Sequence, residues 1–223
     1  MEYAEFLRQK VHLTGSFGFD PVWMPDCAFD FQAHVITKAV RKGRIGLFED
    51  TGLGKTLQQL AIAENIIRHT NKRVLILTPL AVAFQFIDEA SRIGVGDIEH
   101  IRDSRMSKKI VVCNYERLHL LNADDFVCVM LDESSILKNF AGKTRDQVIA
   151  FIKRVPYRFL STATPSPNDF IELGNSSEAL GYMGYMDMLT KFFKSNQGSV
   201  DSNNRNIGEK FYLKPHAERD FFA

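Results

Sequence analysis

The hydrophobic and polar positions along the 223-residue chain follow two alternating patterns. Short runs of consecutive apolar residues are typical of strands buried on both faces of a sheet. Between them lie stretches whose apolar residues recur every three or four positions, as on one side of a helix. The predicted strands are 44–48, 73–78, 98–101, 109–114, 126–131 and 158–163. This order predicts an α/β fold with a parallel sheet covered by helices on both faces.

The helical pattern occupies most of the remaining chain. The predicted helices are 2–11, 29–40, 57–67, 81–92, 142–153 and 182–193, with a helical turn at 115–120 and further helices beginning at 169 and 216. Residues 195–209 are rich in Asn, Ser and Gly and have too few apolar side chains to offset the loss of conformational entropy, which predicts a flexible loop. We therefore expect an N-terminal extension over 1–24 and a globular lobe over 25–194. The flexible loop and the truncated start of a further element would occupy 195–223.

Composition narrows the function classes. The chain has 28 Lys and Arg against 27 Asp and Glu, so a polyanion would have to be bound by local patches rather than by a global basic field. No apolar run approaches membrane-spanning length, and the N-terminus does not look like a signal peptide, so we expect a cytoplasmic protein without a membrane partner. Cys113 and Cys128 fall in predicted strands and are expected to be buried thiols rather than zinc ligands.

A glycine-rich stretch, Glu49-Asp50-Thr51-Gly52-Leu53-Gly54-Lys55-Thr56, separates the strand 44–48 from the helix 57–67. Such a turn lets backbone N–H groups converge on an anion, and the helix N-terminus adds about half a positive charge. Lys55 is expected to reach the β- and γ-phosphates of a nucleotide, and the Thr56 hydroxyl to hold Mg²⁺. Glu49 stands where the strict phosphate-loop pattern has its first glycine. The prediction therefore depends on the flanking strand and helix, and an accidental Gly-rich turn is the alternative.

Polar residues also end other predicted strands. Ligands of parallel α/β sheets bind at the carboxyl ends of the strands, and three further polar clusters occur there: Thr78-Pro79, Asp132-Glu133 and residues 161–164. Asp132 follows the most apolar run and is expected to hold Mg²⁺ through water. Glu133 is expected to orient the water that attacks the γ-phosphate. Capping of the next helix is the alternative for this acidic pair.

Taken together, these segments resemble the motifs of superfamily-two helicases and translocases in their Swi/Snf-like form, most of all the compact phage and bacterial members. They cover about residues 25 to 175 in the family's order. The matching segments are Gln32 for the adenine-reading Q motif, 50–56 for motif I, 78–80 with Phe86 for segment Ia, 114–118 for the Ser-Tyr-Glu segment, 131–139 for motif II and 160–168 for motif III.

The resemblance implies an N-terminal RecA-like P-loop NTPase lobe, the first of two motor lobes, in a bacterial or phage-infected cell. It implies the cofactors ATP and Mg²⁺, with catalytic roles for Lys55, Asp132 and Glu133. The implied ATP-binding residues are Gln32, Thr51, Gly52, Gly54, Lys55 and Thr56, with Thr56 and Asp132 at the metal. The implied contacts to DNA, or to RNA, are Thr78, Pro79, Asn114, Tyr115 and Lys138, and the implied coupling residues are Ser161, Thr162 and Thr164.

Some of these residues also have structural explanations that involve no ligand. Thr78 and Asn114 are also explained as strand-end caps, and Lys138 as a solvated surface lysine. Ser135 departs from the His or Gln that usually connects the nucleotide to motif III.

Aromatic residues also lie near the proposed adenine reader. Phe17, Phe19 and Trp23 precede Gln32 and are candidates either for stacking on adenine or for packing against the lobe, and packing is the expectation for two of the three.

Three functions compete. The leading one is the first motor lobe of an ATP-dependent DNA helicase or translocase, whose second RecA-like lobe would supply the arginine fingers, because nothing after Leu173 resembles that lobe. A nucleotide or small-molecule kinase would use a similar phosphate loop, but it does not require the acidic pair or the cluster at 161–164. The third is a non-catalytic RecA-like binding module.

Overall fold

The computed structural model describes residues 17–135, 142–166, 169–195 and 211–221. Its main sheet has six parallel strands. They are β1 (Arg44–Phe48), β2 (Arg73–Thr78), β3 (Ile98–His100), β4 (Ile110–Asn114), β5 (Phe126–Asp132) and β6 (Tyr157–Thr162). The spatial order is β1-β6-β5-β2-β4-β3. The predicted parallel sheet is confirmed, and β5 lies between β6 and β2.

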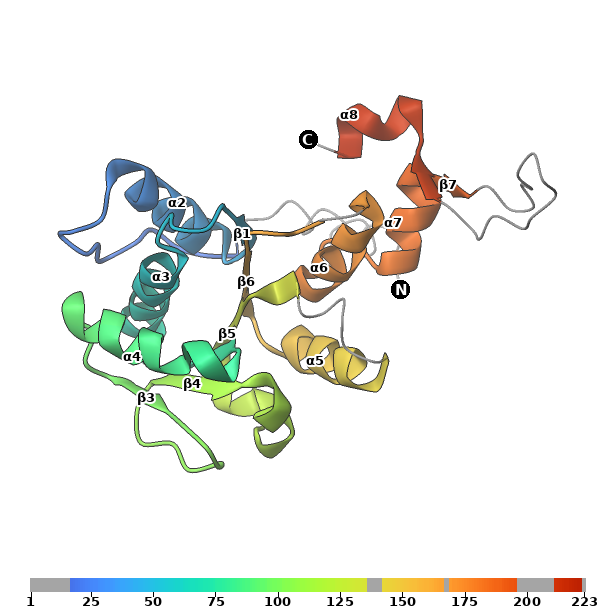
Figure 1. The fold of residues 1–223 in the computed structure, drawn as a ribbon. Coiled ribbons are helices and arrows are strands. Elements are labelled where there is room, and N and C mark those ends of the chain that lie inside the picture. Colours follow the sequence, from blue (N-terminus) through green and yellow to red (C-terminus); the bar gives the residue numbers. More distant parts are fainter. Residues whose placement is uncertain (1–16, 136–141, 167–168, 196–210, 222–223) are drawn as a thin grey trace, which may run out of the picture.

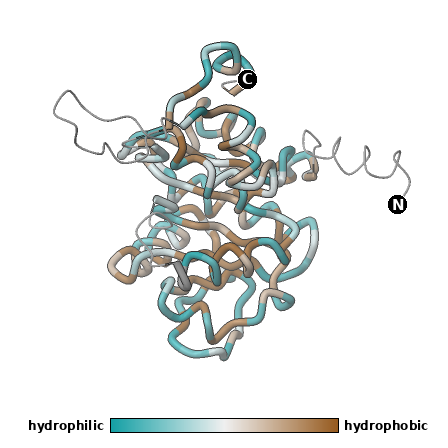
Figure 2. The backbone as a smooth tube through the Cα atoms, turned by 90° about the vertical axis from the view of Figure 1, so that its right-hand side faces the viewer, coloured by the Kyte–Doolittle hydropathy of each residue, from teal (hydrophilic) through white to brown (hydrophobic). Residues whose placement is uncertain are grey.

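Helices cover both faces of this sheet (Figure 1). On one face lie α2 (Asp30–Lys42), α3 (Lys55–Thr70) and α4 (Ala83–Arg92), and on the other α5 (Gly142–Arg154) and α6 (Leu173–Leu180). In β2, Val74 and Ile76 join the core under the first group, whereas Leu75 and Leu77 join the core under the second. Consecutive strand residues point to opposite faces, which explains the unbroken apolar run. Figure 2 shows apolar segments running through the interior.

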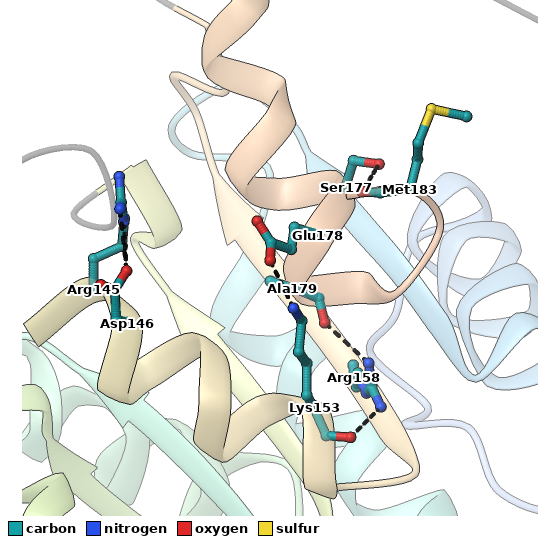
Figure 3. A network of polar contacts seen from close by, with 8 residues as sticks. All are labelled: Arg145, Asp146, Lys153, Arg158, Ser177, Glu178, Ala179 and Met183. Atoms are coloured by element: carbon teal, nitrogen blue, oxygen red, sulfur yellow. Dashed lines mark hydrogen bonds and ion pairs between the residues drawn. The ribbon is translucent and has the colours of Figure 1, made fainter. Parts of the chain in front are cut away.

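A buried arginine of β6 holds the second helical layer in place (Figure 3). The guanidinium of Arg158, only 7% exposed, donates from Nε to the carbonyl of Val155 at 2.8 Å and from Nη2 to that of Lys153 at 2.6 Å. Its Nη1 donates to the carbonyl of Ala179 at 3.3 Å. The carbonyls lie at or just beyond the C-terminal ends of α5 and α6, where the helix dipole favours a cation. Arg158 thereby ties two helices to the sheet.

The C-terminal part forms a small separate layer. Helix α7 (Tyr185–Phe192) leads into β7 (Phe193–Ser195), which pairs antiparallel with β8 (Phe211–Leu213). The predicted helix 182–193 is therefore too long at both ends, because Phe193 already belongs to a strand. A 3₁₀ turn then precedes the short helix α8 (Glu218–Phe221), so the helix predicted from 216 begins later. The β7–β8 pair joins residues on both sides of the predicted boundary at 195.

Some predictions fall outside the described residues: the helix 2–11, almost all of the loop 195–209, and Lys138. In the part of the chain that the structure covers, no helix is long and apolar enough to span a bilayer. Cys113 and Cys128 are buried and unpaired, as expected from their strands, while Cys27 is exposed.

Candidate nucleotide-binding site

The glycine-rich loop connects the end of β1 to the first turn of α3. Gly54, the N-cap residue of α3, has a φ of 79°, and a Cβ there would lie 2.4 Å from Nε2 of Gln32. Glycine at this position is thus required both by the left-handed backbone and by the close approach of a side chain. Gly52 has a φ of 84°, and the space within 4 Å of its would-be Cβ contains none of the surrounding atoms. The loop therefore combines a fixed helix start with open space.

Backbone and amide contacts hold this loop in shape. The Lys55 ammonium donates to the carbonyl oxygens of Glu49 and Asp50, at 2.8 Å each. Gln58 donates from Nε2 to Oε2 of Glu49 at 2.8 Å and to the Leu53 carbonyl at 3.2 Å. Glu49, which replaces the glycine of the strict pattern, thus anchors the loop to α3 through its carboxylate.

The end of β5 carries the first acid of the predicted pair. Oδ1 of Asp132 accepts a hydrogen bond from Nε2 of Gln59 at 2.9 Å, and Oδ2 accepts one from the Thr78 hydroxyl at 2.9 Å. Burial raises the pKa of the Asp132 carboxyl, although these hydrogen bonds and the charge of Lys55 act in the opposite direction. Lys55 and Asp132, distant in sequence, therefore belong to one electrostatic environment.

The second acid is connected to β6. Glu133 has a left-handed backbone with a φ of 52°, an uncommon conformation for a residue other than glycine. Its Oε1 accepts hydrogen bonds from the hydroxyls of Thr162, at 2.9 Å, and of Ser135. The Thr164 N–H donates in turn to the Thr162 hydroxyl at 3.0 Å. A continuous polar chain thus runs from Glu133 into the segment after β6.

Three side chains expected at a nucleic acid lie inside the protein instead. Thr78 is 0% exposed and hydrogen-bonded to Asp132, and Asn114 is 4% exposed. Tyr115 is 3% exposed, and its hydroxyl donates to the Asp132 carbonyl at 2.6 Å. In this structure the side chains of Thr78, Asn114 and Tyr115 are therefore not displayed to a ligand outside the lobe. The hydroxyls of Thr78 and Tyr115 donate to Asp132, and the Asn114 amide donates to Glu116. Pro79 is half-buried.

Gln32 lies beside the loop, as its predicted role requires. Its Oε1 accepts from the Phe29 N–H at 3.0 Å and its Nε2 donates to the Leu53 carbonyl at 3.0 Å. An amide oxygen has two lone pairs and an amide nitrogen two hydrogens, so each atom retains capacity for one more hydrogen bond. Packing is confirmed for Phe19, which stacks on His69 at 3.8 Å, and for Trp23, which packs against the core.

Two neighbours of Gln32 and Asp132 were not predicted from the sequence. Phe29 is 68% exposed three positions before Gln32, and its ring stacks against that of Phe31 at 6.2 Å. An aromatic residue at the start of an amphipathic helix, on the exposed side, was the available signal. Gln59 is the other, and there the signal was a polar amide among the apolar positions of α3, because buried amides require partners.

Among known proteins, no family model matches the chain. A SWI/SNF-related matrix-associated actin-dependent regulator of chromatin subfamily A-like protein 1 from Xenopus tropicalis is 28% identical over 154 residues, which are 64% of this chain and 16% of that protein. Its counterpart from Xenopus laevis is 27% identical over the same shares.

Solved structures agree. The SWI2/SNF2 ATPase core of Sulfolobus solfataricus, solved in complex with dsDNA, matches with a TM-score of 0.64 at 20% identity, over 78% of this chain and 40% of that one. The UvsW helicase of bacteriophage T4 matches with a TM-score of 0.57 at 16% identity, over 82% and 66%. The fold is the RecA-like lobe of SWI2/SNF2 ATPase cores. The expected resemblance to Swi/Snf-like superfamily-two proteins is confirmed.

This RecA-like lobe spans about a sixth of the curated relatives it matches, at 16% of their length. The similar proteins come from frogs, an archaeon and a phage, so they do not support the expected bacterial or phage-infected host in particular.

The residues of the RecA-like lobe fit a nucleoside triphosphate with Mg²⁺. Open space faces Gly52 just before α3, whose second residue, Thr56, carries a hydroxyl. Asp132 at the end of β5 carries a carboxylate, and both groups are oxygen ligands of the kind that Mg²⁺ prefers. Ser134 and Ser161 flank the acidic pair, and their buried hydroxyls have no hydrogen-bond partner in the described chain. Within the same residues no three His, Cys, Asp or Glu side chains gather into a metal-binding cluster.

Proposed function

We propose that the chain is the first motor lobe of an ATP-dependent DNA helicase or translocase, with the lobe itself spanning residues 25–194. The observation that carries this proposal is the hydrogen bond from Gln59 to Asp132, because it joins the helix α3, which begins with Lys55, to the end of β5, where Glu133 follows Asp132. Hydrolysis at the γ-phosphate requires a cationic side chain that binds the phosphates, a carboxylate that holds the metal ion and a second carboxylate that acts as general base. The similarity to a SWI2/SNF2 ATPase core supports the motor assignment.

The proposed nucleotide site uses both ends of the loop. Backbone N–H groups of Thr51, Gly52 and Gly54 and the Lys55 ammonium bind the phosphates. Thr56 and Asp132 hold Mg²⁺, which when bound neutralises charge on the β- and γ-phosphate oxygens. Gln32 uses its two remaining hydrogen-bonding positions to read the adenine edge, and Phe29 offers an exposed aromatic face for stacking on the base.

Glu133 is the proposed general base. Its Oε1 is already engaged by the Thr162 and Ser135 hydroxyls, so the carboxylate is held in one orientation while Oε2 accepts the proton of the attacking water. The hydrogen bonds from Thr162 to Glu133 and from Thr164 to Thr162 make the segment after β6, including Ser161, the proposed coupling element. Movement of this segment would reorient the base.

The proposed polymer is DNA, because the similar archaeal core was solved with dsDNA. Backbone N–H groups and short side chains of the loops after β2 and β4 would contact its phosphates, which positions a strand without reading its sequence. Pro79 and the segment after Asn114 are the proposed contacts, with Lys138 as a third. A second RecA-like lobe is the proposed partner that closes over the nucleotide.

The test is binding of ATP with Mg²⁺, followed by thermal unfolding of wild type and Lys55→Ala. At an ATP concentration about a hundredfold above Kd, ligand linkage is worth about 2.7 kcal/mol, or roughly 5 to 10 °C in Tm for a chain of this size. The Lys55→Ala protein should keep the nucleotide-free Tm and lose this shift, because the hydrogen bonds of the Lys55 ammonium within the described chain go to two carbonyls of the loop rather than to the core. Lys72→Ala, an exposed lysine before β2, is the matched control and should shift like wild type.

A wild-type protein whose Tm does not respond to ATP and Mg²⁺ would refute the proposed function. DNA binding is measured separately, by fluorescence anisotropy of a labelled duplex over a salt series.

A further inference from the structure

Two buried side chains grip the carboxylate of Asp132 from different elements. Gln59 of α3 donates to Oδ1 and Thr78 of β2 donates to Oδ2, each at 2.9 Å. Both donors are 0% exposed, so neither competes with water for its partner. The terminal torsion of an aspartate side chain is soft, and two donors on its two oxygens fix that torsion.

We propose that Gln59 and Thr78 are positioning residues that set the orientation of the Asp132 carboxylate for Mg²⁺, an inference that rests on the proposed nucleotide-binding function. An ionised carboxylate has about four lone-pair positions. One on each oxygen is occupied by a protein donor, and the others remain for the waters of a bound cation. Partners of this kind commonly change metal affinity by about 10- to 100-fold.

The geometry of Gln59 argues for such a role over a purely structural one. Its Oε1 has no hydrogen-bond partner in the described chain, although the residue is fully buried. An unsatisfied buried acceptor costs roughly 1–3 kcal/mol, and an apolar side chain of the same size would avoid that cost. The Nε2 donor to Asp132 is the contact that such a substitution would lose. A local violation of good packing is typical of a functional position.

Thr78 reaches Asp132 because of the strand order. Leu77 of β2 is in register with Leu131 of β5, so Thr78 and Asp132 are the next residues on two neighbouring parallel strands. The β-branched threonine buries its methyl group and directs its hydroxyl at Oδ2.

Tyr115 adds support from one strand further away. Its hydroxyl donates to the Asp132 carbonyl at 2.6 Å, which holds the backbone from which the carboxylate projects. Residues at or just after the ends of β2 and β4 therefore both donate hydrogen bonds to Asp132. The carboxylate of Asp132 is thus held by Gln59 and Thr78, and its backbone by Tyr115.

The test compares Kd for ATP in EDTA with Kd for ATP at saturating Mg²⁺, on wild type, Thr78→Val and Gln59→Met. The ratio of Kd in EDTA to Kd in Mg²⁺ measures the coupling between metal and nucleotide. Each substitution is nearly isosteric and removes one donor. We expect Kd in EDTA to stay within about twofold of wild type and the ratio to fall about tenfold in each variant. The nucleotide-free Tm of Gln59→Met should equal or exceed that of wild type.

Two further variants separate positioning from structure. Thr78→Ser keeps the hydroxyl and should restore the wild-type ratio. Thr70→Val makes the same chemical change as Thr78→Val at the far end of α3, where the hydroxyl donates to the Ile66 carbonyl at 2.7 Å, and should leave the ratio unchanged.

The outcomes are distinct. Wild-type ratios in Thr78→Val and Gln59→Met would overturn the inference, and so would an equal fall in Thr70→Val, which would reveal general destabilisation. A wild-type chain with the same Kd in EDTA and in Mg²⁺ would refute magnesium binding itself, and the proposed function with it.

Discussion

Thr162 donates a hydrogen bond from its hydroxyl to Oε1 of Glu133 at 2.9 Å, across the ends of two neighbouring strands. Asp132 and Ser161 are paired in register, so the next residue of each strand faces the other. Ser135 donates to the same Oε1. In this chain the polar connection from the end of β5 to β6 therefore runs through the carboxylate of Glu133. That carboxylate accepts hydrogen bonds from both Thr162 and Ser135.

Substitution Glu133→Gln should separate binding from turnover. The glutamine oxygen still accepts from Thr162, so the network and the nucleotide affinity should persist, while proton abstraction is lost. We expect an unchanged Tm shift with ATP and Mg²⁺ and residual hydrolysis lowered at least about 100-fold. Single-turnover measurements with protein in excess provide the rate. Hydrolysis at the wild-type rate would assign the base elsewhere.

Removal of the exposed ring at Phe29 should weaken base binding. Stacking on an aromatic side chain is worth about 1–3 kcal/mol per base, so Phe29→Ala should raise Kd for ATP roughly 5- to 100-fold. The affinity for inorganic triphosphate should be unchanged. Because the side chain is 68% exposed, Tm should stay near the wild-type value. Phe84→Ala, at another exposed ring (57%), is the control, and an equal loss of affinity there would contradict the role of Phe29.

Arg158→Met should destabilise the lobe, because three carbonyl groups lose their donor at once. Burial lowers the pKa of Arg158 to about 10, with the charge of Arg44 contributing. We expect a loss of about 3 kcal/mol of unfolding free energy, or about 6 to 12 °C in Tm. Urea unfolding measures it. Arg105→Met, at a side chain 90% exposed, should leave the urea midpoint unchanged.

Glu99 should make the loop before β4 sensitive to acid. Partial burial raises the pKa of its carboxyl, but hydrogen bonds from the N–H groups of Lys108 (2.6 Å) and Ser107 (2.5 Å), together with the Ser107 hydroxyl, lower it by more. A carboxyl with a lowered folded-state pKa contributes stability above its unfolded pKa and loses it as the pH falls through the folded-state pKa.

Glu99→Gln should therefore lower Tm by about 2 to 4 °C at pH 7. The difference from wild type should begin to shrink as the pH falls past the ordinary glutamate pKa of about 4.3, and should vanish once the pH is below the lowered folded-state pKa. Differential scanning calorimetry over this pH range follows both proteins. A Tm gap that is independent of pH would show that shape rather than charge matters, and Glu89→Gln in an exposed ion pair of α4 provides the comparison.

The 223-residue chain by itself should hydrolyse ATP very slowly. The hydrogen bonds described around Lys55, Asp132 and Glu133 involve no arginine. An arginine finger is typically worth about 10³ to 10⁵ in rate. We expect hydrolysis near background and no more than slight stimulation by duplex DNA, in a phosphate-release assay. Strong DNA-stimulated turnover would show that the chain, or a second copy of it, supplies this charge.

The sequence predicted the elements of the site better than their contacts. Gly54 and Lys55 belong to a local unit of strand, turn and helix, whose predicted pattern lies within the consecutive residues 44–67. The Thr78 hydroxyl was interpreted from its position at a strand end, and the partner on the next strand depends on sheet order, which a single sequence does not specify. That is why a residue expected at a nucleic acid proved to be bonded to Asp132.

The end of α7 shows the same difference between local and distant information. The apolar positions 182–193 fit a helix, and no local signal distinguishes Phe193 as a strand residue. Its strand forms because Leu213 and its neighbours pair with it from beyond residue 210. The strand continues the apolar pattern of the helix without a break, so the pattern does not mark where one ends and the other begins.

The place of β1 in the sheet has a consequence for synthesis on the ribosome. β1 pairs with β6 alone in the described sheet, and the register joins Arg44 to Arg158. As the chain emerges N-terminus first, the strand that leads into the phosphate loop has no hydrogen-bonded neighbour until β6 has been translated. During that interval its backbone is an open edge to which another nascent chain can bind. We therefore expect the yield of folded lobe to depend on how well β1 is protected while the residues between β1 and β6 are synthesised.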